Sequence, residues 1–72
     1  MYIIIEIQSN GENVSTLVTV KETRNDAESV YHSVLAAAAI SSVEKHSAVL
    51  LTSEGKHIMS QVYYHTNEGA TE

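Results

Sequence analysis

Histidine is the residue type of this chain best suited to bind a metal or to transfer a proton. Zinc needs three or four converging imidazole or carboxylate ligands, which commonly include a pair spaced i, i+3 or i, i+4 on a helix or a tight pair on a loop. None of the histidines has such a neighbour; they are His32, His46, His57 and His65. We therefore expect no metal site and no cofactor. The simpler interpretation is partly exposed strand histidines and one histidine on a helix surface.

A response to pH is the alternative role for these histidines. Unperturbed imidazole titrates near pH 6.5, so protonation of all four histidines changes the formal charge from −5 to −1 (−5 + 4). If the histidines lie at an interface between copies, assembly should weaken below about pH 6. A molecular size that stays constant from about pH 5 to about pH 8 would contradict this hypothesis.

Covalent catalysis is not indicated by the serines. No serine stands in a Gly-x-Ser-x-Gly elbow, and the chain has no cysteine. Tyr31, His32 and Ser33 are adjacent in the sequence, but consecutive residues of a helix point about 100° apart and cannot meet at one substrate atom. We therefore expect that the protein is not an enzyme.

The composition describes a single small domain. A chain of 72 residues buries only about 60% of the surface that it exposes when unfolded, so self-association would add stability. Nine acidic residues against four scattered basic ones argue against nucleic-acid binding, which needs clustered lysine and arginine. We find no apolar run of membrane-spanning length and no signal-peptide pattern at Met1. We expect a cytoplasmic protein that binds neither nucleic acid nor a membrane.

The first of two predicted β-hairpins pairs residues 2–8 with residues 14–22. Asn10-Gly11 is a strong signal for its turn, because both central turn positions need φ > 0. Counting outward from this turn places Ile7 opposite Val14 and gives one apolar inner face, which comprises Met1, Ile3, Ile5, Ile7, Val14, Val18 and Val20. The opposite face would present Tyr2, Ile4 and Leu17 to water as an apolar patch.

Residues 25–40 are the only segment with a helical pattern. Asn25 is the predicted N-cap, with Glu28 at the spacing of a capping box. One broad apolar stripe follows the helix and comprises Ala27, Val30, Tyr31, Val34, Leu35 and Ala38. Ile40 points nearly opposite this stripe, and the helix is expected to end near Ser41 or Ser42.

The second predicted hairpin joins residues 47–52 to residues 58–66. Gly55 suits the left-handed position of its three-residue turn. Counting from there places Leu50 opposite Ile58, His57 opposite Leu51, and His46 opposite Val62. The outer face would then carry Val49, Leu51, Met59 and Tyr63.

Together these elements predict an α+β domain over residues 1–66 with the order β-β-α-β-β. Four antiparallel strands would form one sheet, and the helix would pack across one face of it. Residues 67–72 (NEGATE) are small, polar and acidic, which predicts a disordered tail. A single helix leaves the second sheet face uncovered, and that half-apolar face is the main functional indication.

The stretch AESVYHSVLAAAAISSV, followed by HSAVLLTSEG and a closing YYH, is similar to a group of short uncharacterised proteins encoded in bacterial phage and prophage regions. The similarity covers roughly residues 24–65 and is carried by Ala27, Glu28, Tyr31, His32, Leu35, the alanine run 36–39, His46, Gly55, Tyr64 and His65. The group has no assigned activity, so the resemblance implies a phage or prophage setting and no mechanism.

The sequence therefore predicts a non-catalytic, self-associating protein that acts through protein–protein contacts, most simply as a homodimer and alternatively with a phage or host protein. The predicted contact surface is the outer sheet face with the end of the helix: Tyr2, Ile4, Leu17, Val49, Leu51, Met59, Tyr63 and Ile40. Two alternatives remain open. One is an acidic inhibitor that imitates nucleic-acid charge against a host protein, and its binding would weaken steeply with salt. The other is a small-ligand groove between helix and sheet in an oligomer.

Overall fold

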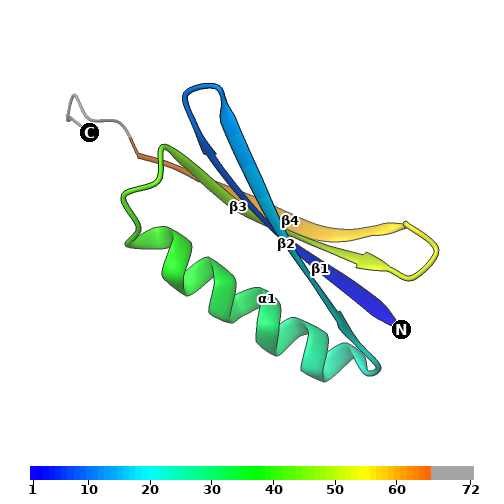
Figure 1. Cartoon of the computed structure of the whole chain (residues 1–72). Helices are drawn as coiled ribbons and strands as arrows, with labels where there is room; N and C mark the ends of the chain where they lie inside the picture. Colours follow the sequence, from blue (N-terminus) through cyan, green and yellow to red (C-terminus); the bar gives the residue numbers. More distant parts are fainter. Residues whose placement is uncertain (66–72) are drawn as a thin grey trace.

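One helix lies across one face of a four-stranded antiparallel sheet (Figure 1). The computed structural model describes residues 1–65, so the predicted tail at 67–72 lies outside the described residues. The elements are β1 (Tyr2–Asn10), β2 (Asn13–Lys21), α1 (Arg24–Ala39), β3 (Lys45–Thr52) and β4 (His57–Tyr64). The predicted α+β architecture and element order are confirmed.

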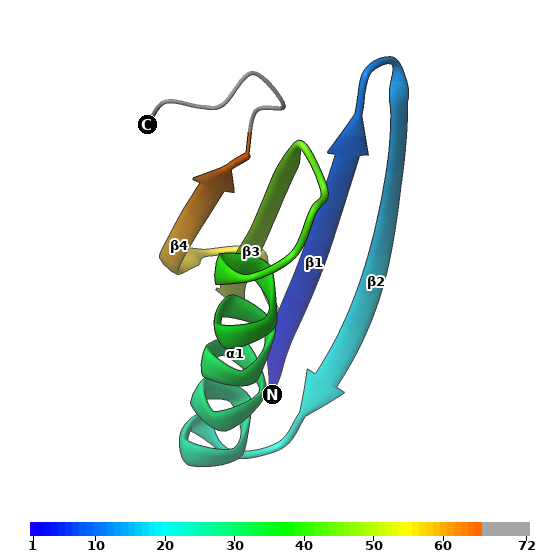
Figure 2. The ribbon, with the colours of Figure 1, turned by 90° about the vertical axis from the view of Figure 1, so that its left-hand side faces the viewer.

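The strand order within the sheet is β2-β1-β3-β4. β1 pairs with β2 on one side and with β3 on the other, both antiparallel, so the first strand of the chain is a central strand. Figure 2 shows α1 on one side of the sheet and no element of the described chain on the other side. β2 and β4 form the two edges of the sheet.

The predicted apolar stripe of the helix is confirmed. Its members are all buried or half-buried: Ala27, Val30, Tyr31, Val34, Leu35 and Ala38. All of them except Ala38 belong to, or pack against, a core cluster with Ile4 of β1 and with Ala48 and Leu50 of β3, which are at most 1% exposed. Among the described residues there is no helix with the length and apolar character that a membrane crossing requires.

The N-cap of the helix lies two residues before the predicted one. Thr23 is the N-cap: its backbone is extended, and its side-chain oxygen accepts a hydrogen bond from the Asp26 backbone N–H at 3.1 Å. The predicted N-cap at Asn25 is wrong, because Asn25 already lies inside the helix. Glu28 pairs instead with Arg24 at 2.6 Å across one helical turn.

The register of the first hairpin is shifted by two residues from the predicted one. Gly11 and Glu12 form the turn, and Asn10 pairs with Asn13, so Ile7 lies opposite Thr16 rather than Val14. Contacts with a distant segment accompany this turn. Glu44 binds it twice, accepting from the Gly11 N–H and donating its own N–H to the Asn10 side chain, each at 2.8 Å. Because the shift is even, residues predicted to share a face still do so.

The helix covers the face of the first hairpin that was predicted to face water. Tyr2, Ile4 and Leu17 are on the helix side, and Ile4 is 1% exposed. The predicted inner face of this hairpin is the uncovered one. The covered side offers the helix the small Ala48 as a close contact, and it provides a buried partner for the carboxylate of Glu6.

A β-bulge shifts the second hairpin by one residue. Leu51 lies opposite His57 as predicted, but the register changes between Leu50 and Leu51. Leu50 therefore pairs with Met59, not Ile58, and His46 pairs with Tyr63, not Val62. A shift of one residue turns every following side chain to the other face. Met59 and Tyr63 consequently face the helix, where both pack against the core.

The N-cap assignment gives a direct test of stability. Thr23→Ala should lower the free energy of unfolding by about 1 kcal/mol, because the Asp26 N–H loses its acceptor. Asn25→Ala is the matched control and should change it by no more than about 0.5 kcal/mol. Urea unfolding of both variants measures the difference. A larger loss for Asn25→Ala than for Thr23→Ala would contradict the assignment.

Candidate functional site

The uncovered face of the sheet is a continuous apolar surface, which we call the open face. The strand registers place ten apolar or aromatic residues on it: Ile3, Ile5, Ile7, Val14, Val18, Val20, Val49, Leu51, Val62 and Tyr64. Val18, Ile5 and Val49 follow one another across three strands and form its central row. Such a contiguous patch is uncommon on a monomer and usually marks a contact surface.

The open face carries little charge. Among the described strands the one carboxylate belongs to Glu6, and it is on the helix side. Lys45 and His57 lie at opposite ends of the open face. The remaining acids of the described chain are in the helix, the turns and the connections, so no carboxylate of these residues belongs to the open face.

The residues predicted as one contact surface are divided between different places. Tyr2, Ile4, Met59 and Tyr63 lie on the helix side, and Val49 and Leu51 lie on the open face. Leu17 is on the helix side yet 62% exposed, and Ile40 is 87% exposed at the helix end. The idea that they form one surface is therefore wrong. The sequence had assigned Ile3, Ile5, Ile7, Val18 and Val20 to the core.

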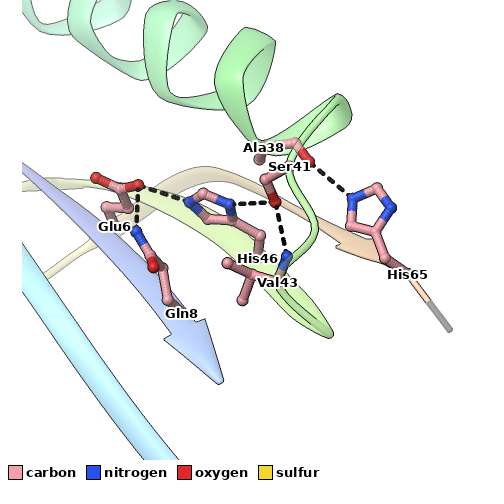
Figure 3. Close-up of polar contacts among 7 residues, drawn as sticks. All are labelled: Glu6, Gln8, Ala38, Ser41, Val43, His46 and His65. Carbon is pink, nitrogen blue, oxygen red and sulfur yellow. Dashed lines mark hydrogen bonds and ion pairs between the residues drawn. The ribbon is translucent and has the colours of Figure 1, made fainter. Parts of the chain in front are cut away.

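A network of polar side chains lies between the end of α1 and the covered side of the sheet (Figure 3). His46 Nε2 is 2.6 Å from Glu6 Oε2, and His46 Nδ1 is 2.9 Å from Ser41 Oγ. Gln8 donates to the same Glu6 oxygen at 3.1 Å, and the Val43 N–H donates to Ser41 Oγ at 3.3 Å. The His46 side chain is only 4% exposed, which corrects the predicted partly exposed histidine.

The donors and acceptors of this polar network can be assigned consistently. A carboxylate only accepts, so Nε2 of His46 donates to Glu6. With a neutral imidazole, Nδ1 then accepts from the Ser41 hydroxyl, whose oxygen is free to accept from Val43. Every member has a partner, and this satisfies the strong requirement for pairing of buried polar groups. The contact links residues 40 apart in sequence, and the sequence signal for it was Glu6 within the otherwise apolar run of residues 2–7.

The order serine–histidine–carboxylate is also the composition of a hydrolytic triad. Ester or amide cleavage needs donors for the developing oxyanion, which a helix N-terminus supplies well. Ser41 instead lies two residues beyond the end of α1, where the helix dipole is negative and opposes an oxyanion. The Val43 N–H is already directed at the serine oxygen itself. The geometry therefore favours a structural role for these groups.

The other histidines are not members of this polar network. His65 Nε2 donates to the Ala38 carbonyl at 2.8 Å, and this carbonyl also accepts from the Ser41 N–H at 3.3 Å at the helix end. His32 is exposed and meets the Tyr31 ring edge-on, and His57 contacts Ser60 Oγ at 3.0 Å. Within residues 1–65, no three histidine, aspartate or glutamate side chains are grouped so that they could hold a metal ion.

Comparison with known proteins finds no relative of this chain. No family model matches the chain, and neither a curated protein nor a solved structure matches it. The resemblance to phage and prophage proteins therefore stays a prediction from the sequence.

Substitutions of Glu6 should lower the free energy of unfolding by an amount that depends on whether an acceptor for His46 remains. Glu6→Ala leaves the buried Nε2 of His46 without its acceptor and should lower the free energy of unfolding by about 1–3 kcal/mol. Glu6→Gln keeps an acceptor oxygen and should cost less. Urea unfolding of the two variants checks the order. Equal losses would mean that the hydrogen bond contributes nothing beyond side-chain packing.

Because Tyr31 is buried, we expect the free energy of unfolding to depend on pH in the alkaline range. Burial, and secondarily the charge on Tyr63, raises the pKa of Tyr31 above its ordinary value of 10.0. The folded chain thus holds this proton more tightly than the unfolded chain, so stability is intact below pH 10 and falls as the pH rises beyond it. Tyr31→Phe should flatten the fall measured by urea unfolding from about pH 8 to about pH 11. Tyr64→Phe, at a 68% exposed site, should not.

Proposed function

We propose that this protein is a non-catalytic, self-associating module that acts through the open face of its sheet. The observation that carries the proposal is the continuous apolar surface on the side of the sheet away from α1. Burial of apolar surface stabilises by about 25 cal/mol per Å², so an uncovered face of this kind favours association. A phage or prophage setting and contact with a phage or host protein belong to the same proposal through the sequence resemblance.

The charge distribution favours a second copy as the occupant. The chain carries a formal net charge of −5, so two copies repel each other at most of their surface. On the open face this repulsion is weakest, because Glu6, the carboxylate of the described strands, is on the helix side. A two-fold contact through this face would bring no carboxylate of the described strands of one copy against the same face of the other.

The size of the face is adequate for a stable pair. At ordinary strand spacing and rise, four strands of eight or nine residues span about 19 Å by about 28 Å, or roughly 500 Å² in projection. Two such faces bury about 1,000 Å² in projection, which reaches the minimum expected of a specific interface. The small core of the monomer gains most from this extra burial.

The acidic-inhibitor alternative receives less support. Imitation of nucleic acid needs carboxylates in rows that match phosphate positions. In the described chain they are dispersed over turns, connections and the helix: Glu6, Glu12, Glu22, Asp26, Glu28, Glu44 and Glu54.

Molecular mass in solution tests the proposal. The wild-type chain should have a mass of two or more chains by light scattering. Val49→Glu places a charge in the central row of the open face and should lower this mass, because the contact through the open face is lost. Val62→Glu, at a 43% exposed position of the same face, should raise the dissociation constant and disturb the monomer less.

Ile40→Glu is the matched control. It replaces an apolar residue that is 87% exposed and distant from the open face, so the mass should not change. A wild-type chain that stays monomeric at all accessible concentrations would overturn the proposal. Circular dichroism of each variant establishes that the fold is retained.

A further inference from the structure

β2 is an unprotected edge of the sheet. It pairs with β1 over nine consecutive residues without interruption, and its outer edge has no partner among the described residues. Residues 13–20 of this strand contain no proline and no charge, and Lys21 stands only at its end. Edge strands are usually protected by charges, proline or bulges. The opposite edge has such protection, because the β3–β4 pairing is interrupted by a bulge.

The sequence of β2 is complementary to itself in the antiparallel direction. A two-fold antiparallel pair always sets one residue opposite its own copy, and full pairing of Asn13–Lys21 makes this residue Leu17. Val14 then lies opposite Val20 of the second copy, and Thr16 opposite Val18. Lys21 lies opposite Asn13, so no like charges meet.

Among the described residues, Leu17 is not part of the hydrophobic core and is not packed against it. It lies on the helix side, opposite Glu6, and is 62% exposed. An exposed leucine in the middle of an edge strand gains a directly opposed neutral partner when the same strand of a second copy is added.

We propose that the β2 strands of two copies pair edge to edge, with Leu17 opposite Leu17, to form one continuous eight-stranded sheet. Backbone hydrogen bonds supply the contact, as in other cases of strand addition. Both helices then lie on the same side, and the two open faces merge into one surface of twice the width. This pairing uses a different surface from the open-face contact and does not depend on it.

Single cysteines in this cysteine-free chain test the register. Directly opposed residues of an antiparallel pair have the Cα separation that a disulfide requires. Leu17→Cys should form a covalent dimer with oxidised glutathione roughly tenfold or more faster than Ile40→Cys, the collision control. Thr16→Cys and Val18→Cys should both be slower than Leu17→Cys. A maximum at position 16 or 18, or no rate above that of Ile40→Cys, would overturn the proposal.

The open-face contact cannot imitate a positive result. Leu17 is on the helix side of the sheet, so stacking of two open faces keeps the Leu17 side chains apart. Leu17→Cys combined with Val49→Glu should therefore still form covalent dimers, and their mass should be that of two chains. Failure of this double variant to cross-link, when Leu17→Cys alone does so, would contradict an edge contact independent of the open face.

Discussion

A single helix can shield only one side of a four-stranded sheet, and the chemistry of the two sides follows from that constraint. The shielded side holds Ile4, Leu50 and the small Ala48 against α1, together with the paired Glu6 and His46. The other side is made largely of β-branched residues that have no second layer in the described chain. Each 100 Å² of apolar surface left in water forgoes about 2.5 kcal/mol, a large amount beside the 5–15 kcal/mol that stabilises a typical domain.

Much of the architecture could be predicted from the sequence because its signals were periodic. The helical stripe through Tyr31 and Leu35 is an amphipathic pattern, and it is buried as expected. Because side chains alternate between the two faces of a strand, the residues of the first hairpin that were predicted to share a face do share one. Alternation could not determine which face the helix covers, because β1 is apolar on both sides. That choice depends on β3, which pairs with β1 from a distant part of the chain.

The errors in register had causes that no local sequence rule could reveal. The turn at Gly11 is held by Glu44, 33 residues away, and no local rule includes that contact. The bulge beside Leu50 turned Met59 and Tyr63 toward the core. The pairing of His46 with Glu6 was also missed, because the two residues are 40 apart in the sequence. A glutamate in the run YIIIEIQ was the one visible sign that the central strand needed a polar partner.

The central position of β1 has a consequence for how the chain is made. β1 is complete at Asn10, and β2 can join it at once through a short turn, but its second neighbour begins only at Lys45. At about 5–20 residues per second of synthesis, a delay of seconds separates the two events. During that interval the nascent hairpin has one unpaired side and apolar residues above and below. We therefore expect the newly made chain to be most prone to aggregation before β3 is available to pair with β1.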